Sequence, residues 1–192
     1  MSVPKLYVSE PPWIFVDVLS DEERKRMPSF FYDKPGSSPV IRVLRGHKMA
    51  TVQGLMDEFG AALQFFDGFG ENWYALKDCL CYLDEWMKGD AYILIITRPW
   101  RLLRDESSEQ LDWLYTTLNE VGDWWSKPIA NNEPYNRPPI PFHVVLQFGY
   151  LDFRETGSQF STFPFLRPGF VGSNDMGEGR HPEATTADED IV

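Results

Sequence analysis

The sequence predicts an α/β fold: a three-stranded parallel sheet packed with helices and extended at both ends of the chain. Residues 91–97 form a continuous apolar run, which is typical of a strand buried on both faces of a parallel sheet. Two further apolar runs lie at residues 40–45 and 142–148, and helical patterns occupy the chain between the three runs. Because parallel strands connect by right-handed helical crossovers, this order favours one sheet with helices packed against it.

The 192 residues, 43% of them hydrophobic, are enough for one complete core with additions. We divide the chain into an N-terminal extension (residues 1–38), the α/β domain (39–149), an aromatic-rich extension expected to pack on that domain (150–171), and an acidic tail (172–192). The tail carries six acids and one arginine among small polar residues, so we expect it to be disordered.

The N-terminal extension contains an apolar run at residues 12–16, which we expect to dock on the core in an extended conformation. Ser20 and Glu23 have the spacing of a capping box, which predicts a short charged helix that Pro28 ends. An aromatic cluster then follows before the first strand of the domain: Phe30, Phe31 and Tyr32.

Three helices are predicted in the domain. Thr51 can cap the first helix. Asn72 can cap the second helix, which we expect to begin at about Trp73 and to extend to Met87. The third is predicted from about Ser108 to Trp125. Each has an apolar stripe at helical spacing, formed in turn by Val52, Leu55, Met56, Phe59 and Leu63; by Trp73, Leu76, Leu80, Leu83 and Met87; and by Leu111, Leu114, Tyr115, Leu118 and Val121.

The second helix has a contrasting polar face. Tyr74, Asp78, Cys81 and Glu85 share that side, with Lys77 at its edge. One interpretation is an ordinary solvated face. The other is a partner surface, because a mid-helix aspartate is a poor helix former and a tyrosine provides a rigid amphipathic contact. Helical spacing alone leaves both interpretations open.

The segments 69–72, 75–76 and 78–80 resemble the signature of the barstar family, small intracellular inhibitors of secreted ribonucleases such as barnase. The strand and helix before these segments, and the strand, helix and strand after them, extend the similarity over roughly residues 39–149. The resemblance implies a barstar-like fold and a protein that is not an enzyme. It also implies that the second helix and the loop before it enter a ribonuclease active site, where carboxylates replace the RNA phosphates.

The resemblance makes Asp78 the central anchor of such a contact, since a carboxylate can form charge-assisted hydrogen bonds with the basic groups of a nuclease site. It also places Phe69 and, on the third helix, Glu120 in the contact. The remaining contact positions are changed relative to barstar: Gly68 stands for a tyrosine, Tyr74 for an acid, Lys77 for a tryptophan and Cys81 for a threonine.

The expected function is therefore inhibition of a ribonuclease or nuclease toxin, as an immunity protein with altered specificity. The alternative is a structural or regulatory interaction protein that kept the fold without nuclease inhibition. An enzyme is disfavoured, because Asp78 and Glu85 lie about 10 Å apart along the helix and no histidine, serine nucleophile or Gly-rich loop converges with them.

The formal charge of −11 and pI near 4.7 disfavour nucleic acid as a partner and favour a basic protein. Cys79 and Cys81 point in different directions on a helix, so we expect reduced thiols and a cytoplasmic location. A metal site at this cysteine pair is the weaker alternative, because His47, His143 and His181 have no ligand spacing. We expect no cofactor, no membrane span or signal peptide, and a monomer when the protein is free.

Overall fold

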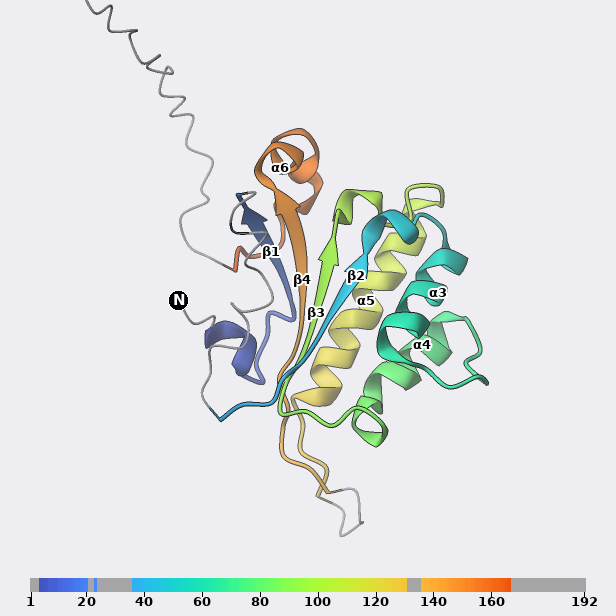
Figure 1. Cartoon of the computed structure of the whole chain (residues 1–192), viewed down its shortest axis with the longest axis vertical. Coiled ribbons are helices and arrows are strands. Elements are labelled where there is room, and N and C mark those ends of the chain that lie inside the picture. The colour runs from blue at the N-terminus through green and yellow to red at the C-terminus, as the bar shows by residue number, and fades with distance from the viewer. Residues whose placement is uncertain (1–3, 21–22, 24–35, 131–135, 167–192) are drawn as a thin grey trace, which may run out of the picture.

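Four parallel strands form the central sheet of the computed structural model, which describes residues 4–20, 23, 36–130 and 136–166 (Figure 1). The strands lie in the order β1-β4-β3-β2. Their bounds are Ile14–Leu19 for β1, Val40–Arg45 for β2, Tyr92–Thr97 for β3 and Phe142–Gly149 for β4. The α/β class and the parallel sheet agree with the prediction from sequence, and β2, β3 and β4 are the three predicted strands.

The predicted number of strands is wrong, because the N-terminal extension contributes a fourth. Its apolar run forms β1, which pairs in parallel with β4 from Ile14 opposite Val144 to Leu19 opposite Gly149. Without β1, the outer edge of β4 would present unpaired N–H and C=O groups. The extension therefore docks by complete strand pairing.

Three helices, α3 (Val52–Leu63), α4 (Trp73–Cys81) and α5 (Ser108–Trp125), lie on one side of the sheet, and α6 (Tyr150–Thr156) follows β4 (Figure 1). Both predicted caps are confirmed: Thr51 Oγ1 accepts from the amide of Gly54 at 3.1 Å, and Asn72 Oδ1 from that of Ala75 at 3.0 Å. Five 3₁₀ turns complete the described part: η1 Pro4–Tyr7, η2 Gly46–Lys48, η3 Leu83–Glu85, η4 Pro99–Arg101 and η5 Gly157–Phe160.

Helix α4 ends at Cys81, earlier than the predicted end near Met87. The indole N–H groups of Trp124 and Trp125 donate to the carbonyls of Cys81 and Leu80, each at 2.9 Å. These carbonyls at the helix end are thus satisfied by α5 rather than by another turn of α4. Beyond the helix end, Leu83 and Met87 are still buried, so the apolar stripe predicted from sequence continues without the helix.

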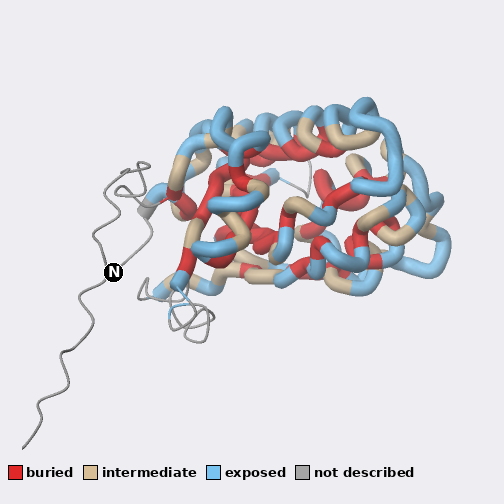
Figure 2. Tube along the Cα trace, turned by 90° about the horizontal axis from the view of Figure 1, so that it is seen from above, coloured by how far each residue is buried: buried red, intermediate tan, exposed pale blue. Residues whose placement is uncertain are grey.

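Each face of the sheet is covered. Alternate residues of β3 and β4 point toward α3, α4 and α5, and the others point to the opposite face. That second face is covered partly by Leu6 of η1 and by Leu166 from beyond α6. Leu166 is held there because its amide donates to the Val16 carbonyl at 2.9 Å, while the Val16 amide donates to Pro164. Buried segments consequently lie inside the molecule and exposed ones outside (Figure 2).

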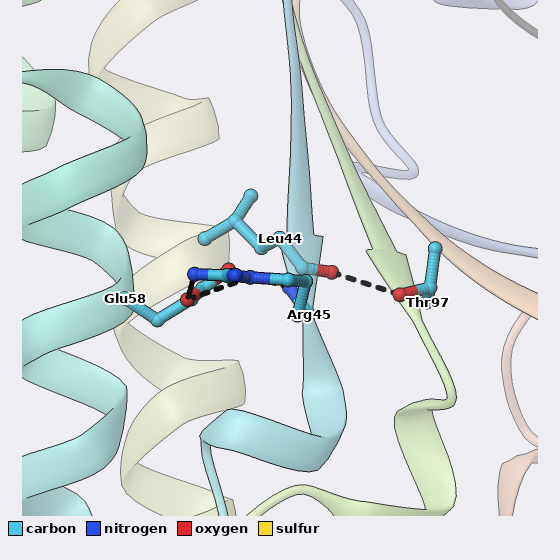
Figure 3. Close-up of polar contacts among 4 residues, drawn as sticks. All are labelled: Leu44, Arg45, Glu58 and Thr97. Carbon is cyan, nitrogen blue, oxygen red and sulfur yellow. Dashed lines mark hydrogen bonds and ion pairs between the residues drawn. The ribbon is translucent and has the colours of Figure 1, made fainter.

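An ion pair joins the end of β2 to α3 (Figure 3). Arg45 binds Glu58 through Nη2 to Oε2 at 2.8 Å and Nε to Oε1 at 2.9 Å, and the Arg45 amide also donates to Oε1 at 2.8 Å. Burial by itself would raise the pKa of Glu58, but the hydrogen bonds and charge of Arg45 outweigh burial and lower it. On the other side of β2, the Thr97 hydroxyl donates to the Leu44 carbonyl at 3.2 Å.

The segment after β4 is helical in part, which its sequence pattern did not predict. Phe153 packs on Phe148 with ring centroids 5.2 Å apart, and Phe160 on the same ring at 5.0 Å. In the N-terminal extension, Ser20 and Glu23 form the capping-box hydrogen bonds, between the Ser20 amide and Glu23 Oε2 at 2.9 Å and between the Glu23 amide and Ser20 Oγ at 3.3 Å. Apart from Glu23, the predicted charged helix lies outside the described residues, as do the 30–32 cluster, residues 167–171 and the acidic tail.

Candidate partner-binding face

The loop between α3 and α4 is held by its own aromatic residues. The Phe65 ring contacts Phe69 edge to face at 4.9 Å and Trp86 at 6.1 Å, and the Trp86 indole donates to the Leu63 carbonyl at 2.9 Å. The loop leaves α3 through Gln64, whose φ of 56° is left-handed and whose amide closes the helix on Gly60. These contacts join the loop to the end of α3 and to Trp86, which lies beyond α4.

Tyr74 and Asp78 are the exposed residues at the centre of the α4 face. Tyr74 is 77% exposed, and Asp78, one turn further on, is also exposed. Within the described residues neither side chain makes a hydrogen bond, and Asp78 makes no ion pair. Both are thus available to another molecule without the loss of an internal contact.

Lys77 and Glu120 meet each other beside this centre. Lys77 Nζ lies 2.8 Å from Glu120 Oε2, and both side chains are about half exposed. The hydrogen bond to Glu120 raises the pKa of Lys77. Two residues predicted as separate partner contacts therefore form a neutral pair that joins α4 to α5.

Cys81 differs from its predicted place on the exposed face. Its side chain is 7% exposed, because α5 packs over the end of α4, where the Trp124 indole binds the Cys81 carbonyl. Burial raises the pKa of the Cys81 thiol to about 12, which suppresses its thiolate. Cys79 is buried as well, and both thiols are free.

Gly68 and Phe69 occupy the loop in different ways. Phe69 is half-buried against Phe65, at the base of the loop, whereas Gly68 is exposed. Phe66, which the sequence analysis did not single out, is 62% exposed and is the outermost aromatic residue of this loop. Its closeness in sequence to Gly68 and Phe69, two predicted contact residues, is the feature that could have identified Phe66 from the sequence. We refer to Phe66, Gly68, Tyr74, Asp78 and the Lys77–Glu120 pair as the α4 face.

The described residues contain no group of three or more His, Cys, Asp or Glu side chains that could hold a metal ion. No helix in the described ranges is long and apolar enough to cross a membrane. Three exposed acids lie in this part of the chain, with Asp67 and Glu71 in the loop and Asp78 on α4. The face therefore presents carboxylates and aromatic rings.

Parallel strands with three helices on one side define an α/β domain, and α4 presents an exposed carboxylate, Asp78, without a described partner. Comparison with known families gives the particular class: the family model described as "Barstar (barnase inhibitor)" matches residues 40–147. This match covers more than half of the chain, so the chain belongs to the barstar family. A search of curated proteins finds no match.

Family membership confirms the resemblance inferred from the segments around Asp78. Barstar-family proteins are inhibitors without enzymatic activity, and this membership indicates a ribonuclease-inhibitor-like role for the chain. The residues through which the chain would contact a ribonuclease are still predictions.

Proposed function

We propose that the chain is a stoichiometric inhibitor of a basic ribonuclease or nuclease toxin, bound through the α4 face. The observation that carries the proposal is Asp78, an exposed carboxylate without a described partner on the helix that follows the family's signature loop. In a nuclease active site such a carboxylate takes the place of a substrate phosphate and accepts charge-assisted hydrogen bonds from arginine and lysine.

The charge of the chain supports a basic partner. With a net charge of −11, the protein attracts a cation-rich surface, and this attraction increases the association rate at low salt. Asp67, Glu71 and Asp78 concentrate part of that charge on the α3–α4 loop and on α4. The expected salt dependence distinguishes this encounter from a purely apolar one.

The changed residues favour a partner other than barnase. The Lys77–Glu120 pair supplies no net charge to the α4 face, and Tyr74 offers a ring where barstar has an acid. The face thus relies on one central carboxylate and on aromatic contact. A nuclease with fewer basic groups and more apolar surface around its cleft fits this arrangement best.

The test measures binding and inhibition with purified basic secreted and toxin ribonucleases from the same source, with barnase included. Asp78→Ala should weaken binding to the cognate nuclease by at least about 30-fold, the loss typical of a central interface residue. The control is Glu155→Ala, an exposed acid on α6, which lies well away from α4 and should leave the affinity unchanged (Figure 1).

Equal affinity of Asp78→Ala and wild type would remove Asp78 from the interface. If wild type bound and inhibited none of these nucleases, the inhibitor function itself would be wrong. A second candidate, an interaction protein without nuclease inhibition, is favoured by the changes at Gly68, Tyr74 and Lys77 relative to barstar. For that candidate, the α4 face would bind a protein whose nuclease activity is absent or unaffected.

A further inference from the structure

We propose that Phe66, seated on Gly68, is an aromatic anchor of the α4 face and that the partner nuclease has an apolar recess beside the basic site that receives Asp78. This inference rests on the proposed function and specifies the kind of nuclease surface that the face fits. It assigns a role to a residue outside the short signature and gives a structural reason for the glycine that follows it.

Phe66 is exposed although the loop around it is well packed. Its side chain is 62% exposed, while Phe65 and Phe69 on either side of it are half-buried against each other. The Phe69 amide donates to the Phe66 carbonyl at 2.9 Å, which closes a turn at this point. A hydrogen-bonded turn therefore presents an apolar ring to water, and exposed aromatic residues are common among interface hot spots.

Gly68 provides the space that this ring occupies. A Cβ atom built on Gly68 would lie 3.0 Å from Cε2 and 3.2 Å from Cδ2 of Phe66, closer than side chains normally approach. The backbone of Gly68 does not adopt the left-handed conformation, so this glycine provides space next to the ring rather than a special φ angle. The Phe66 ring thus lies against the Gly68 backbone before binding, and a side chain that already occupies its bound position loses less entropy on association.

The charges around the ring indicate the partner. Asp67 and Glu71 are exposed in the same loop, and Asp78 is exposed on α4. The cation on this face, Lys77, is paired with Glu120. Aromatic rings at Phe66 and Tyr74 combined with these acids match a basic cleft that has an apolar recess at its border, where the recess excludes water and strengthens the neighbouring charge contacts.

The first experiment measures the affinity of Phe66→Ala for the ribonuclease that wild type binds most tightly in the panel described above. We expect at least about 30-fold weaker binding, mostly through faster dissociation, with an unchanged free energy of unfolding because the ring is exposed. The matched control is Leu151→Ala on α6, a 70% exposed apolar residue, which should bind as wild type does.

The second experiment tests the contact between Gly68 and the Phe66 ring with a double-mutant cycle. Gly68→Ala displaces the ring and should weaken binding in the wild-type background, but it should have no further effect when Phe66 is already alanine. Additive losses would overturn the seating role of Gly68. Wild-type affinity of Phe66→Ala, together with a large loss for Asp78→Ala, would overturn the aromatic anchor and leave the inhibitor function standing.

Discussion

Gly122 of α5 leaves the space that the Trp13 ring occupies at the start of β1. A Cβ atom on Gly122 would approach the ring atoms of Trp13 to 2.3 Å, and the Trp13 indole donates to Asp123 Oδ1 at 2.8 Å. Trp13 therefore attaches the N-terminal extension directly to α5.

We expect Gly122→Ala to lower the free energy of unfolding by about 1–3 kcal/mol, because the added methyl overpacks this contact. Urea denaturation measures the change. The matched control is Gly60→Ala in α3, where a Cβ atom would lie 3.8 Å from its nearest neighbour and where alanine should stabilise the helix by about 0.5–1 kcal/mol. Equal effects of the two substitutions would contradict the tight fit of Trp13.

His143 is a fully buried titratable group between β4 and the N-terminal extension. Its Nε2 lies 2.8 Å from the Val8 carbonyl, and the rings of Trp13 and Phe15 lie 5.6 Å away. Burial lowers the pKa of His143, although the carbonyls of Val8 and Pro12 act in the opposite direction. The folded protein thus holds this imidazole neutral at a pH where the unfolded chain already binds a proton.

The sign of the pH effect follows from that difference. As the pH falls below about 6.5, the unfolded chain takes up the proton first, so the free energy of unfolding should fall by up to about 1.4 kcal/mol per pH unit. His143→Gln cannot titrate and should flatten this decline between pH 6.5 and 5, measured by urea denaturation. An equally steep decline in the variant would assign the effect to another group.

Among the secondary-structure elements, β2 and α3 are joined by the Arg45–Glu58 pair. We expect Glu58→Gln to lower the free energy of unfolding by about 1–3 kcal/mol at pH 7, since hydrogen bonds to charged groups are lost at a buried acceptor. Asp57→Asn, at the exposed neighbouring position, should change it by less than about 0.5 kcal/mol.

The lowered pKa of Glu58 adds a pH window to this prediction. Its contribution is fully present above the unfolded pKa of about 4.5 and is lost as the pH falls through the lower pKa of the folded protein. Glu58→Gln should therefore lose less stability than wild type on acidification below pH 4.5. A parallel decline in both proteins would show that the pair does not contribute in this way.

The elements that sequence predicted best are those with local signals. The caps at Thr51 and Asn72 and the bounds of α5 depend on residues within one turn, and all three agree with the structure. The early end of α4 depends on two tryptophans more than 40 positions away, which helical spacing cannot show. Strand β1 was expected only as an extended segment, because its partner β4 is distant in the chain.

The same division applies to the α4 face. The exposure of Tyr74 and Asp78 follows from helical spacing and was predicted, whereas the burial of Cys81 and the pairing of Lys77 with Glu120 depend on how α5 crosses α4. The position of Phe66 depends on a turn and on the glycine beneath the ring. Periodicity thus identifies which side of a helix faces outward, but contacts between elements decide which charges on that side are free.

In the complete chain, the N- and C-terminal extensions cover the edge of β4 and the second face of the sheet. Removing them from residues 39–149 would unpair the edge of β4 and uncover Ile93, Ile95 and Val145 on the second face of the sheet. We expect a protein limited to 39–149 to aggregate or to lose cooperative unfolding, as followed by circular dichroism in urea.

The control for this truncation is a chain of residues 1–171, which lacks only the acidic tail and should unfold as the full chain does. Cooperative unfolding of 39–149 with the stability of the full chain would show that the extensions are dispensable for the fold. The comparison therefore also tests the division of the chain proposed from its sequence.

The pairing of β1 with β4 has a consequence for how the protein is made. Ile14 lies opposite Val144, so 130 residues separate the first strand from its partner. At a synthesis rate of about 5–20 residues per second, β1 leaves the ribosome roughly 7–26 s before β4 can pair with it. During that interval an apolar strand has no sheet to join. Strand β1 is thus made well before its partner and can take its final place in the sheet only after β4 has been synthesised.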